Sequence, residues 1–250
     1  TDYLVSSQKF SNDNQLLIVF SDISKLKTLE KMREDFIGNV SHELRTPISV
    51  IKANSETLLS AKLIKDENAI NFTKAIQSQS ERMATIVNEL LSISSMESGD
   101  YPISLDKLNI KNIVDSAIKE LNPMTESSNI KLVNKISDIT HIIGDESAIK
   151  IIISNYITNA IKHSPDDEII EIDNEKIDKD FCRIKVIDNG IGIAKKYRER
   201  VFERFFRVDK GRSKKIGGTG LGLSISKNLA LMMGYSCLLY TSDAADDCWS

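Results

Sequence analysis

The sequence predicts an α+β chain in which an antiparallel pair of long helices precedes an α/β sandwich. The first hundred residues contain only two of the 11 glycines, Gly38 and Gly99, and their apolar residues recur at helical spacing. Eight glycines fall between positions 190 and 234, where strand and helix patterns alternate and loops around a ligand are expected. With 250 residues and 41% hydrophobic content, the chain can form one or two domains with real cores.

Two long helices are expected after a strand over residues 15–20. The first spans residues 24–61, with one apolar stripe made of Phe36, Val40, Leu44, Ile48, Ile51, Ser55 and Leu58. The second spans residues 68–97 and ends at Gly99, a plausible C-cap. Because two such helices cannot bury their stripes alone, we expect a hairpin that dimerises into a four-helix bundle.

The expected elements become shorter after Tyr101 and Pro102, and strands alternate with helices. Strands are expected over residues 103–110, 130–136, 168–172 and 182–188. Helices are expected over residues 111–121, 145–163, 195–203 and 220–233. This mixture predicts one sheet covered by helices.

Composition excludes several classes of protein. The formal net charge of −3 argues against a generic nucleic-acid binder, which usually carries a basic excess. No uninterrupted apolar run is longer than residues 16–20, which is far below the roughly 20 residues of a membrane span. The three cysteines, at positions 182, 237 and 248, have neither disulfide-framework nor zinc-site spacing.

The segment SHELRTP, residues 41–47, is the first candidate site. Helical geometry places His42 away from the apolar stripe, with Thr46 on the same face. A near-neutral imidazole can attack with one nitrogen while the neighbouring Glu43 orients the proton on the other. Pro47 predicts a kink one turn beyond the histidine.

A polar helix face is expected further along the chain. Asn155, Asn159 and Lys162 are spaced four and three residues apart, so they share one face. An amide oxygen suits Mg²⁺, and a lysine can offset the charge of a phosphate.

Two glycine-containing segments complete the candidate site. Asp188 follows a strand and can accept a hydrogen bond from an exocyclic amine such as that of adenine, while Gly190 and Gly192 allow a flat ring to approach the backbone. Residues 217–223 (GGTGLGL) open a helix and can gather N–H donors for phosphates. The charged residues 208–215 before them are expected to form a lid, with Arg207 as a phosphate contact.

In chain order, these segments resemble the H, N, G1, F and G2 boxes of the sensor histidine kinases of two-component systems, above all the PhoR/WalK-like group. FIGNVSHELRTPIS resembles the phosphoacceptor motif. NYITNAIKHS, IDNGIGI, VFERFFR and GGTGLGLSIS resemble the boxes of a GHKL-type ATP-binding domain. The resemblance covers about residues 23 to 235.

This resemblance implies a function for each box. His42 would attack the γ-phosphate of ATP, Glu43 would assist, and Thr46 would position water when the protein dephosphorylates its response regulator. Asn155 would bind Mg²⁺. The implied ATP-binding residues are Asn155, Asn159, Lys162, His163, Asp188, Gly190, Gly192, Arg207, Gly218, Thr219, Gly220, Leu221 and Gly222. His163 stands where the family usually has tyrosine.

The resemblance also implies a division into domains. Residues 1–22 would end an upstream PAS-like sensor module, 23–100 would form the dimerisation and histidine phosphotransfer domain, and 101–236 the ATP-binding domain, truncated at its C-terminus. Residues 237–247 resemble the translation of a transposon-end sequencing adapter, so residues 237–250 are expected to be a non-native tail, with a divergent natural tail as the alternative. The implied partners are a response regulator receiver domain and a second copy of the chain. The implied location is the cytoplasmic side of a bacterial membrane, reached only through segments outside this chain.

Two other functions remain open at this point. A GHKL ATPase used as a conformational clamp would keep the asparagine, aspartate and glycine boxes but would not need SHELRTP. A non-catalytic dimerisation scaffold would bind no Mg-ATP.

Overall fold

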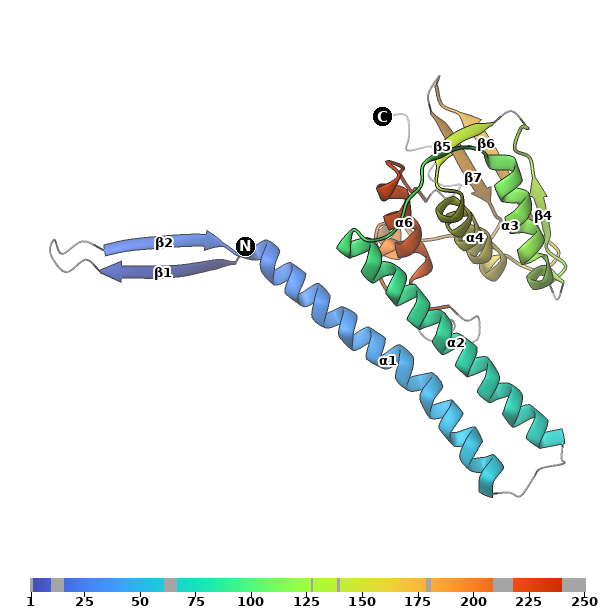
Figure 1. Cartoon of the computed structure of the whole chain (residues 1–250), viewed down its shortest axis with the longest axis horizontal. Coiled ribbons are helices and arrows are strands. Elements are labelled where there is room, and N and C mark those ends of the chain that lie inside the picture. Colours follow the sequence, from blue (N-terminus) through green and yellow to red (C-terminus); the bar gives the residue numbers. More distant parts are fainter. Residues whose placement is uncertain are drawn as a thin grey trace. The chain divides into compact units, whose positions relative to one another are not determined.

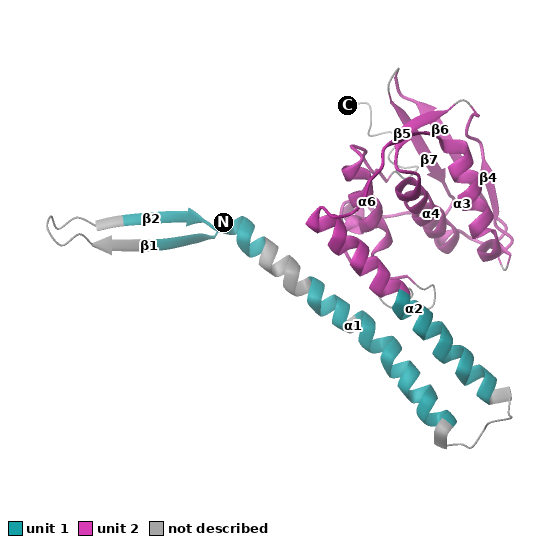
Figure 2. Cartoon of the chain, viewed as in Figure 1, with its two compact units in different colours: residues 1–84 teal, residues 85–250 magenta. Residues whose placement is uncertain are grey.

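The computed structural model of the chain (Figure 1) describes residues 2–9, 16–60, 67–126, 128–138, 140–178, 181–208 and 218–239. The chain divides into two compact units, Thr1–Ala84 and Thr85–Ser250 (Figure 2). The second long helix crosses the boundary between the units. Its C-terminal part therefore belongs with the sandwich that follows it.

The first unit opens with an antiparallel strand pair, β1 (Tyr3–Lys9) and β2 (Leu16–Asp22). Only β2 was expected, because the apolar residues of β1 are consecutive (Tyr3, Leu4 and Val5) and polar residues follow them, so no alternation is visible. Helix α1 (Ser24–Ser60) follows directly. The Asp22 carboxylate accepts a hydrogen bond from the backbone N–H of Ser24 at 2.9 Å, as an N-terminal cap does. Hydrogen bonds from Ser24 lower the pKa of Asp22.

Helices α1 and α2 (Glu67–Ser98) confirm the two predicted long helices. The residues of the predicted α1 stripe are half-buried, except Ile48, which is 49% exposed. Pro47 is buried and lies inside α1. The helix continues without a break past this position, where a kink was expected. Arg82 of α2 donates to the Glu43 carboxylate of α1 at 3.1 Å and ties the two helices together.

The second unit alternates short strands and helices as predicted, with differences in detail. Its elements are β3 (Asp106–Asn109), α3 (Ile110–Thr125), β4 (Lys131–Asn134), β5 (His141–Gly144), α4 (Glu146–His163), β6 (Ile169–Lys176), β7 (Cys182–Ile187), the 3₁₀ turns η1 (Lys195–Tyr197) and η2 (Arg200–Phe202), and α6 (Gly222–Met232). The single helix expected over residues 195–203 is these two separate turns.

The strands of the second unit form two sheets, where a single sheet was expected. β6 pairs in parallel with β4 and antiparallel with β7, while β3 pairs antiparallel with β5. Strand β5 has only four residues, too few to show an alternating pattern in the sequence. No described helix combines the length and apolarity needed to cross a membrane.

The core of the second unit lies between helices α3 and α4 and strands β4 and β6. Its buried members are Ile110, Ile113, Val114, Ala117, Ile130, Ile136, Ile149, Ile153, Ile157, Ala160, Ile161, Ile170 and Ile172. In α4, Ile149, Ile153 and Ile157 recur every four residues and form one buried stripe. The opposite side of α4 is free to carry polar side chains.

The start of α4 is fixed by Asp145. This nearly buried carboxylate accepts hydrogen bonds from the N–H of Ala148 at 2.9 Å and from the N–H of Ser104 at 3.0 Å. It also accepts one from the Ser147 hydroxyl. The bonds from Ser147 and Ser104 lower the pKa of Asp145. Asp145 thereby caps α4 and anchors the segment that precedes β3.

We predict that Asp145→Ala lowers the free energy of unfolding by about 1–2 kcal/mol, because it leaves buried N–H donors without an acceptor. Urea denaturation at neutral pH measures this loss. Since the folded-state pKa of Asp145 is lowered, its contribution is complete above its ordinary pKa of about 4 and disappears as pH falls through the folded value. The difference between parent and variant should therefore shrink in acid.

Asp166→Ala is the matched control, because Asp166 is exposed in a turn. We expect it to change the stability by less than about 0.5 kcal/mol. Equal effects of the two substitutions would contradict the capping role of Asp145.

Candidate functional site

The side chain of Asn155 joins α4 to α6. Its Nδ2 donates to the carbonyl oxygen of Gly222 and to the hydroxyl of Ser226, both at 3.0 Å. Because a carbonyl can only accept, these bonds fix the amide orientation and leave Oδ1 as the oxygen that can accept or coordinate. The polar face of α4 and the glycine-rich segment, predicted separately, therefore meet at this residue.

The turn after β7 packs on the C-terminal end of α4. The Asp188 carboxylate accepts from the N–H of Gly190 at 2.8 Å, and the N–H of Ile191 donates to the His163 carbonyl at 3.3 Å. A Cβ on Gly190 would lie 2.7 Å from both the Asp188 carboxylate and the His163 carbonyl oxygen. Only glycine fits between them, which explains the residue type at this position. Gly192 has a positive φ of 66° in the same turn.

The glycine-rich segment is held against the segment that follows η2. Arg207 donates to the Gly218 carbonyl at 2.8 Å, and the N–H of Phe205 donates to the Gly220 carbonyl at 2.9 Å. Gly220 has φ +74°, and a Cβ there would lie 2.9 Å from the Cα of Phe205. Leu221 is fully buried and anchors the start of α6. The backbone of this segment is thus positioned by packing as well as by its glycines.

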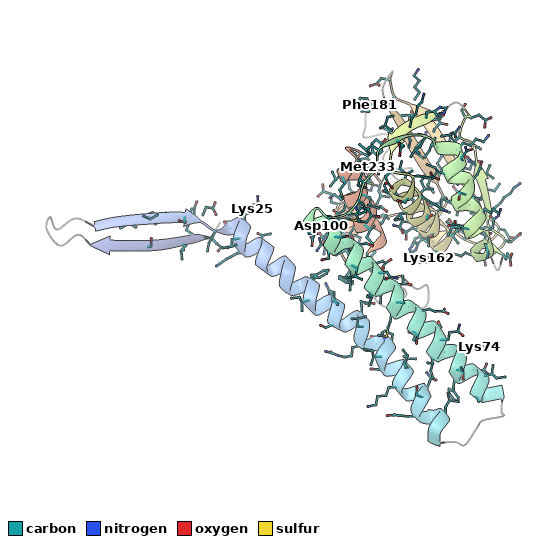
Figure 3. All side chains as sticks on the ribbon, viewed as in Figure 1. Lys25, Lys74, Asp100, Lys162, Phe181 and Met233 are labelled. Atoms are coloured by element: carbon teal, nitrogen blue, oxygen red, sulfur yellow. The ribbon has the colours of Figure 1, made fainter. Side chains whose placement is uncertain are left out.

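Two basic groups stand at the end of α4. Lys162, labelled in Figure 3, is half-buried, and burial lowers its pKa, as does the nearby Arg207, while Glu89 opposes this shift. Desolvation lowers the pKa of His163, and the charge of Lys162 adds to this effect, while Asp188 opposes it. The ammonium group of Lys162 is only partly solvated and therefore attracts anions strongly, so this end of α4 favours binding of a phosphate.

Glu89 is a site residue that sequence reasoning missed. It lies in the part of α2 that belongs to the second unit, where it lines a cavity together with Asn155. Burial raises the pKa of Glu89, while Thr219 and Lys162 oppose the rise. Its sequence position, on a helix with other charged residues, gave no sign of these partners.

A cavity of about 270 Å³ adjoins these groups within the second unit. It is lined by Thr85, Asn88, Glu89, Ser92, Met96, Tyr101, Ile151, Asn155 and Ile225. Asn159 lies one turn beyond Asn155 on α4 and is half-buried. The lining combines carboxylate, amide and hydroxyl groups with an apolar wall, as small-molecule sites do.

The phosphoacceptor segment belongs to the first unit. His42 lies within α1, but its side chain is outside the described residues. Glu43 is paired with Arg82, and Thr46 is exposed. Gly217, the charged stretch 209–215 and the tail residues 240–250 also lie outside the described part of the chain.

The donor set at the site can be tested against a metal ion. Among the described residues, no three His, Cys, Asp or Glu side chains group together as a metal site. An ion beside Asn155 would therefore take most of its ligands from water and from a bound phosphate. Mg²⁺ is the ion that binds in this way, so the residues present fit it.

Comparisons with known proteins match both units of the chain to protein families. A family profile described as "Histidine kinase-, DNA gyrase B-, and HSP90-like ATPase" matches residues 144–246. One described as "His Kinase A (phospho-acceptor) domain" matches residues 32–99. The solved structure of full-length ShkA in complex with AMPPNP has a TM-score of 0.58 and 25% identity, over 80% of this chain and 41% of that chain.

Curated relatives match most of the chain. The sensor-like histidine kinase SenX3 of Mycolicibacterium smegmatis is 36% identical over 88% of this chain and 57% of its own length. The sensor histidine kinase WalK of Bacillus subtilis is 33% identical over 93% of this chain and 38% of its own length. The chain thus spans between about two fifths and three fifths of the length of these relatives.

We predict that Gly220→Ala lowers the stability of the second unit by about 1–3 kcal/mol, because a Cβ there meets the Phe205 backbone and the positive φ is strained. Thermal melting measures the effect as a lower Tm. Gly38→Ala is the control, since a Cβ at this helical glycine meets nothing within 4 Å. It should raise helix stability by up to about 1 kcal/mol, and an equal loss from both variants would refute the proposed packing.

Proposed function

The chain belongs to the sensor histidine kinases, with a phosphoacceptor helical hairpin followed by an ATPase-type domain, and from that premise we propose that it phosphorylates itself on His42 with ATP. The phosphoryl group then passes to an aspartate of a response regulator. The observation that carries this proposal is the hydrogen bond from Asn155 to Gly222, because it unites two predicted nucleotide-binding segments in one site. The ShkA neighbour, solved with an ATP analogue, supports the same ligand class.

The nucleotide site divides into a base end and a phosphate end. At the base end, the Asp188 carboxylate accepts from the adenine amine, and Gly190 and Gly192 allow the ring to lie close to the backbone. At the phosphate end, Lys162 offsets charge and Asn159 offers an amide. The remaining proposed contacts are His163, Arg207, Gly218, Thr219, Gly220, Leu221 and Gly222, which surround the same end of α4 and the start of α6.

Asn155 is the residue proposed to hold Mg²⁺. Its Nδ2 is occupied by Gly222 and Ser226, so Oδ1 is the atom that would face the ion. When bound, the ion would neutralise charge on the phosphates and fix their position. The residues of the chain then serve to orient the nucleotide and to exclude water around it.

The transfer itself is a displacement at phosphorus. A ring nitrogen of His42 attacks the γ-phosphorus, the bond to the ADP oxygen breaks, and ADP leaves with the electron pair. The Glu43 carboxylate holds the proton on the other ring nitrogen, which makes the attacking one more basic. Arg82 fixes that carboxylate from the neighbouring helix, at 3.1 Å, and is therefore proposed as a positioning residue.

We further propose that the hairpin dimerises. Several large apolar side chains of the first unit are exposed in a single chain, among them Ile37 at 54%, Ile48 at 49% and Ile70 at 57%. Apolar side chains spread along both helices favour burial against a second hairpin. A four-helix bundle would also offer a response regulator a helical surface on which to dock.

The test of the kinase proposal is His42→Gln in the full chain, incubated with ATP labelled at the γ-phosphate. We expect the parent to acquire phosphate that is labile in acid and stable in base, and the variant to acquire none. His141→Gln is the matched control, because His141 is an exposed histidine of β5 and should leave labelling intact. Both variants should bind nucleotide like the parent.

The outcome also separates the rival functions. ATP turnover that persists in His42→Gln without any phosphoenzyme in the parent would identify an ATPase instead of a kinase. Failure of the parent to bind Mg-ATP would identify a dimerisation scaffold.

A second proposed activity is dephosphorylation of the response regulator, with Thr46 positioning the attacking water. Thr46→Ala should slow dephosphorylation by at least about tenfold, while phosphohistidine still forms. Thr57→Ala is the control, an exposed threonine of the same helix whose hydroxyl donates to the Ala53 carbonyl. Release of phosphate from a phosphorylated response regulator measures the rate, and an unchanged rate in Thr46→Ala would exclude this role.

A further inference from the structure

Glu89 brings a carboxylate from α2 into the second unit. It lines the cavity beside Asn155, and the nearby Thr219 and Lys162, two residues of the proposed phosphate end, favour its charged form. Its Oε2 atom is buried and has no hydrogen-bond partner among the described residues. A buried carboxylate oxygen without a donor is unfavourable, and Thr219 and Lys162 offset this cost only in part, since burial still raises the pKa of Glu89.

Two other contacts hold the same end of α2 in place within this unit. Glu97 is ion-paired with Arg204, which follows η2. Met96 lines the cavity together with Asn155 of α4 and Ile225 of α6. Figure 2 shows this end of α2 in the colour of the second unit. These contacts hold the part of α2 that carries Glu89 against the rest of the second unit.

A nucleotide phosphate needs the same partners as the Glu89 carboxylate. Both are anions with oxygen acceptors, and both would use the Lys162 ammonium and the Thr219 hydroxyl. Lys162 is half-buried, so two anions beside it would repel each other with little screening by water. Occupation by one anion therefore disfavours occupation by the other.

We propose that Glu89 is an internal competitor of the nucleotide, whose carboxylate occupies the phosphate end of the site and must leave when a nucleotide phosphate binds. This inference rests on the proposed nucleotide site and adds a ligand that the chain itself supplies. By linkage, nucleotide binding releases the C-terminal end of α2, and whatever holds that end in place weakens nucleotide binding by the same factor. The site and the helix that leads back to the phosphoacceptor hairpin are thereby coupled.

The test is Glu89→Gln in the full chain, with Mg²⁺ and AMPPNP as the probe in calorimetric titration. Glutamine keeps the shape and an acceptor for Thr219 but removes the charge, so AMPPNP should bind about tenfold more tightly than to the parent. Glu81→Gln is the matched control, since Glu81 is an exposed glutamate two turns earlier in α2 and belongs to the first unit. It should leave the affinity unchanged.

Hydrogen exchange in the parent chain provides a measurement that needs no variant. AMPPNP should accelerate exchange in residues 85–98, because release of Glu89 frees the end of α2. Slower or unchanged exchange there would overturn the proposal, as would equal or weaker AMPPNP affinity in Glu89→Gln when the parent binds. If neither parent nor variant binds AMPPNP, the proposed nucleotide site fails and the competition fails with it.

Discussion

The hydrogen bonds from Asn155 to Gly222 and Ser226 connect the two helices that carry the proposed nucleotide site. Helix α4 is anchored by its buried isoleucine stripe, and α6 is anchored by Leu221, Ile225 and Leu229. The asparagine amide lies between these rigid elements and sets the glycine-rich backbone beside the polar face of α4. Since Gly222 has no side chain, the amide can approach its backbone closely, and a Cβ there would lie 3.2 Å from Asn155 Oδ1.

Close backbone approach is the common requirement of this site. Gly190 is confined between the Asp188 carboxylate and the His163 carbonyl, and Gly220 is confined by the Phe205 backbone. A larger residue at either position would push apart segments that are distant in the sequence. Glycine therefore serves here to let these segments approach one another closely, and loop flexibility is a smaller part of its role.

Helix α2 belongs to both units, and it carries residues of both proposed sites. Its first half holds Arg82, which pairs with Glu43 beside the proposed phosphoacceptor. Its second half holds Glu97, which pairs with Arg204 after η2, and Glu89, whose charged form is favoured by Lys162 and Thr219. Because α2 is one continuous helix, we infer that occupancy of the proposed nucleotide site can influence the hairpin through this element.

Local pattern alone determined the helices α1, α2, α3, α4 and α6, most strands and the order of the functional motifs. Periodicity over 30 residues or more is unambiguous, which is why α1 and α2 begin and end close to the predicted positions. The five boxes were recognisable because each depends on residue types at short spacing, and the Asn155, Asp188 and Gly220 segments do meet in space. The roles of single residues, including His42, remain predictions from the sequence. The non-native origin of the tail from residue 237 also remains a prediction.

Only the tertiary structure decided which distant groups became partners. The four-residue strand β5 exists because β3 pairs with it, and this pairing also divides the expected single sheet into two. Arg82 and Glu89 appear in the sequence as ordinary charged residues of a helix, and their importance arises from Glu43, Lys162 and Thr219. Sequence spacing describes neighbours along one element, whereas desolvation and ion pairing depend on which elements pack together.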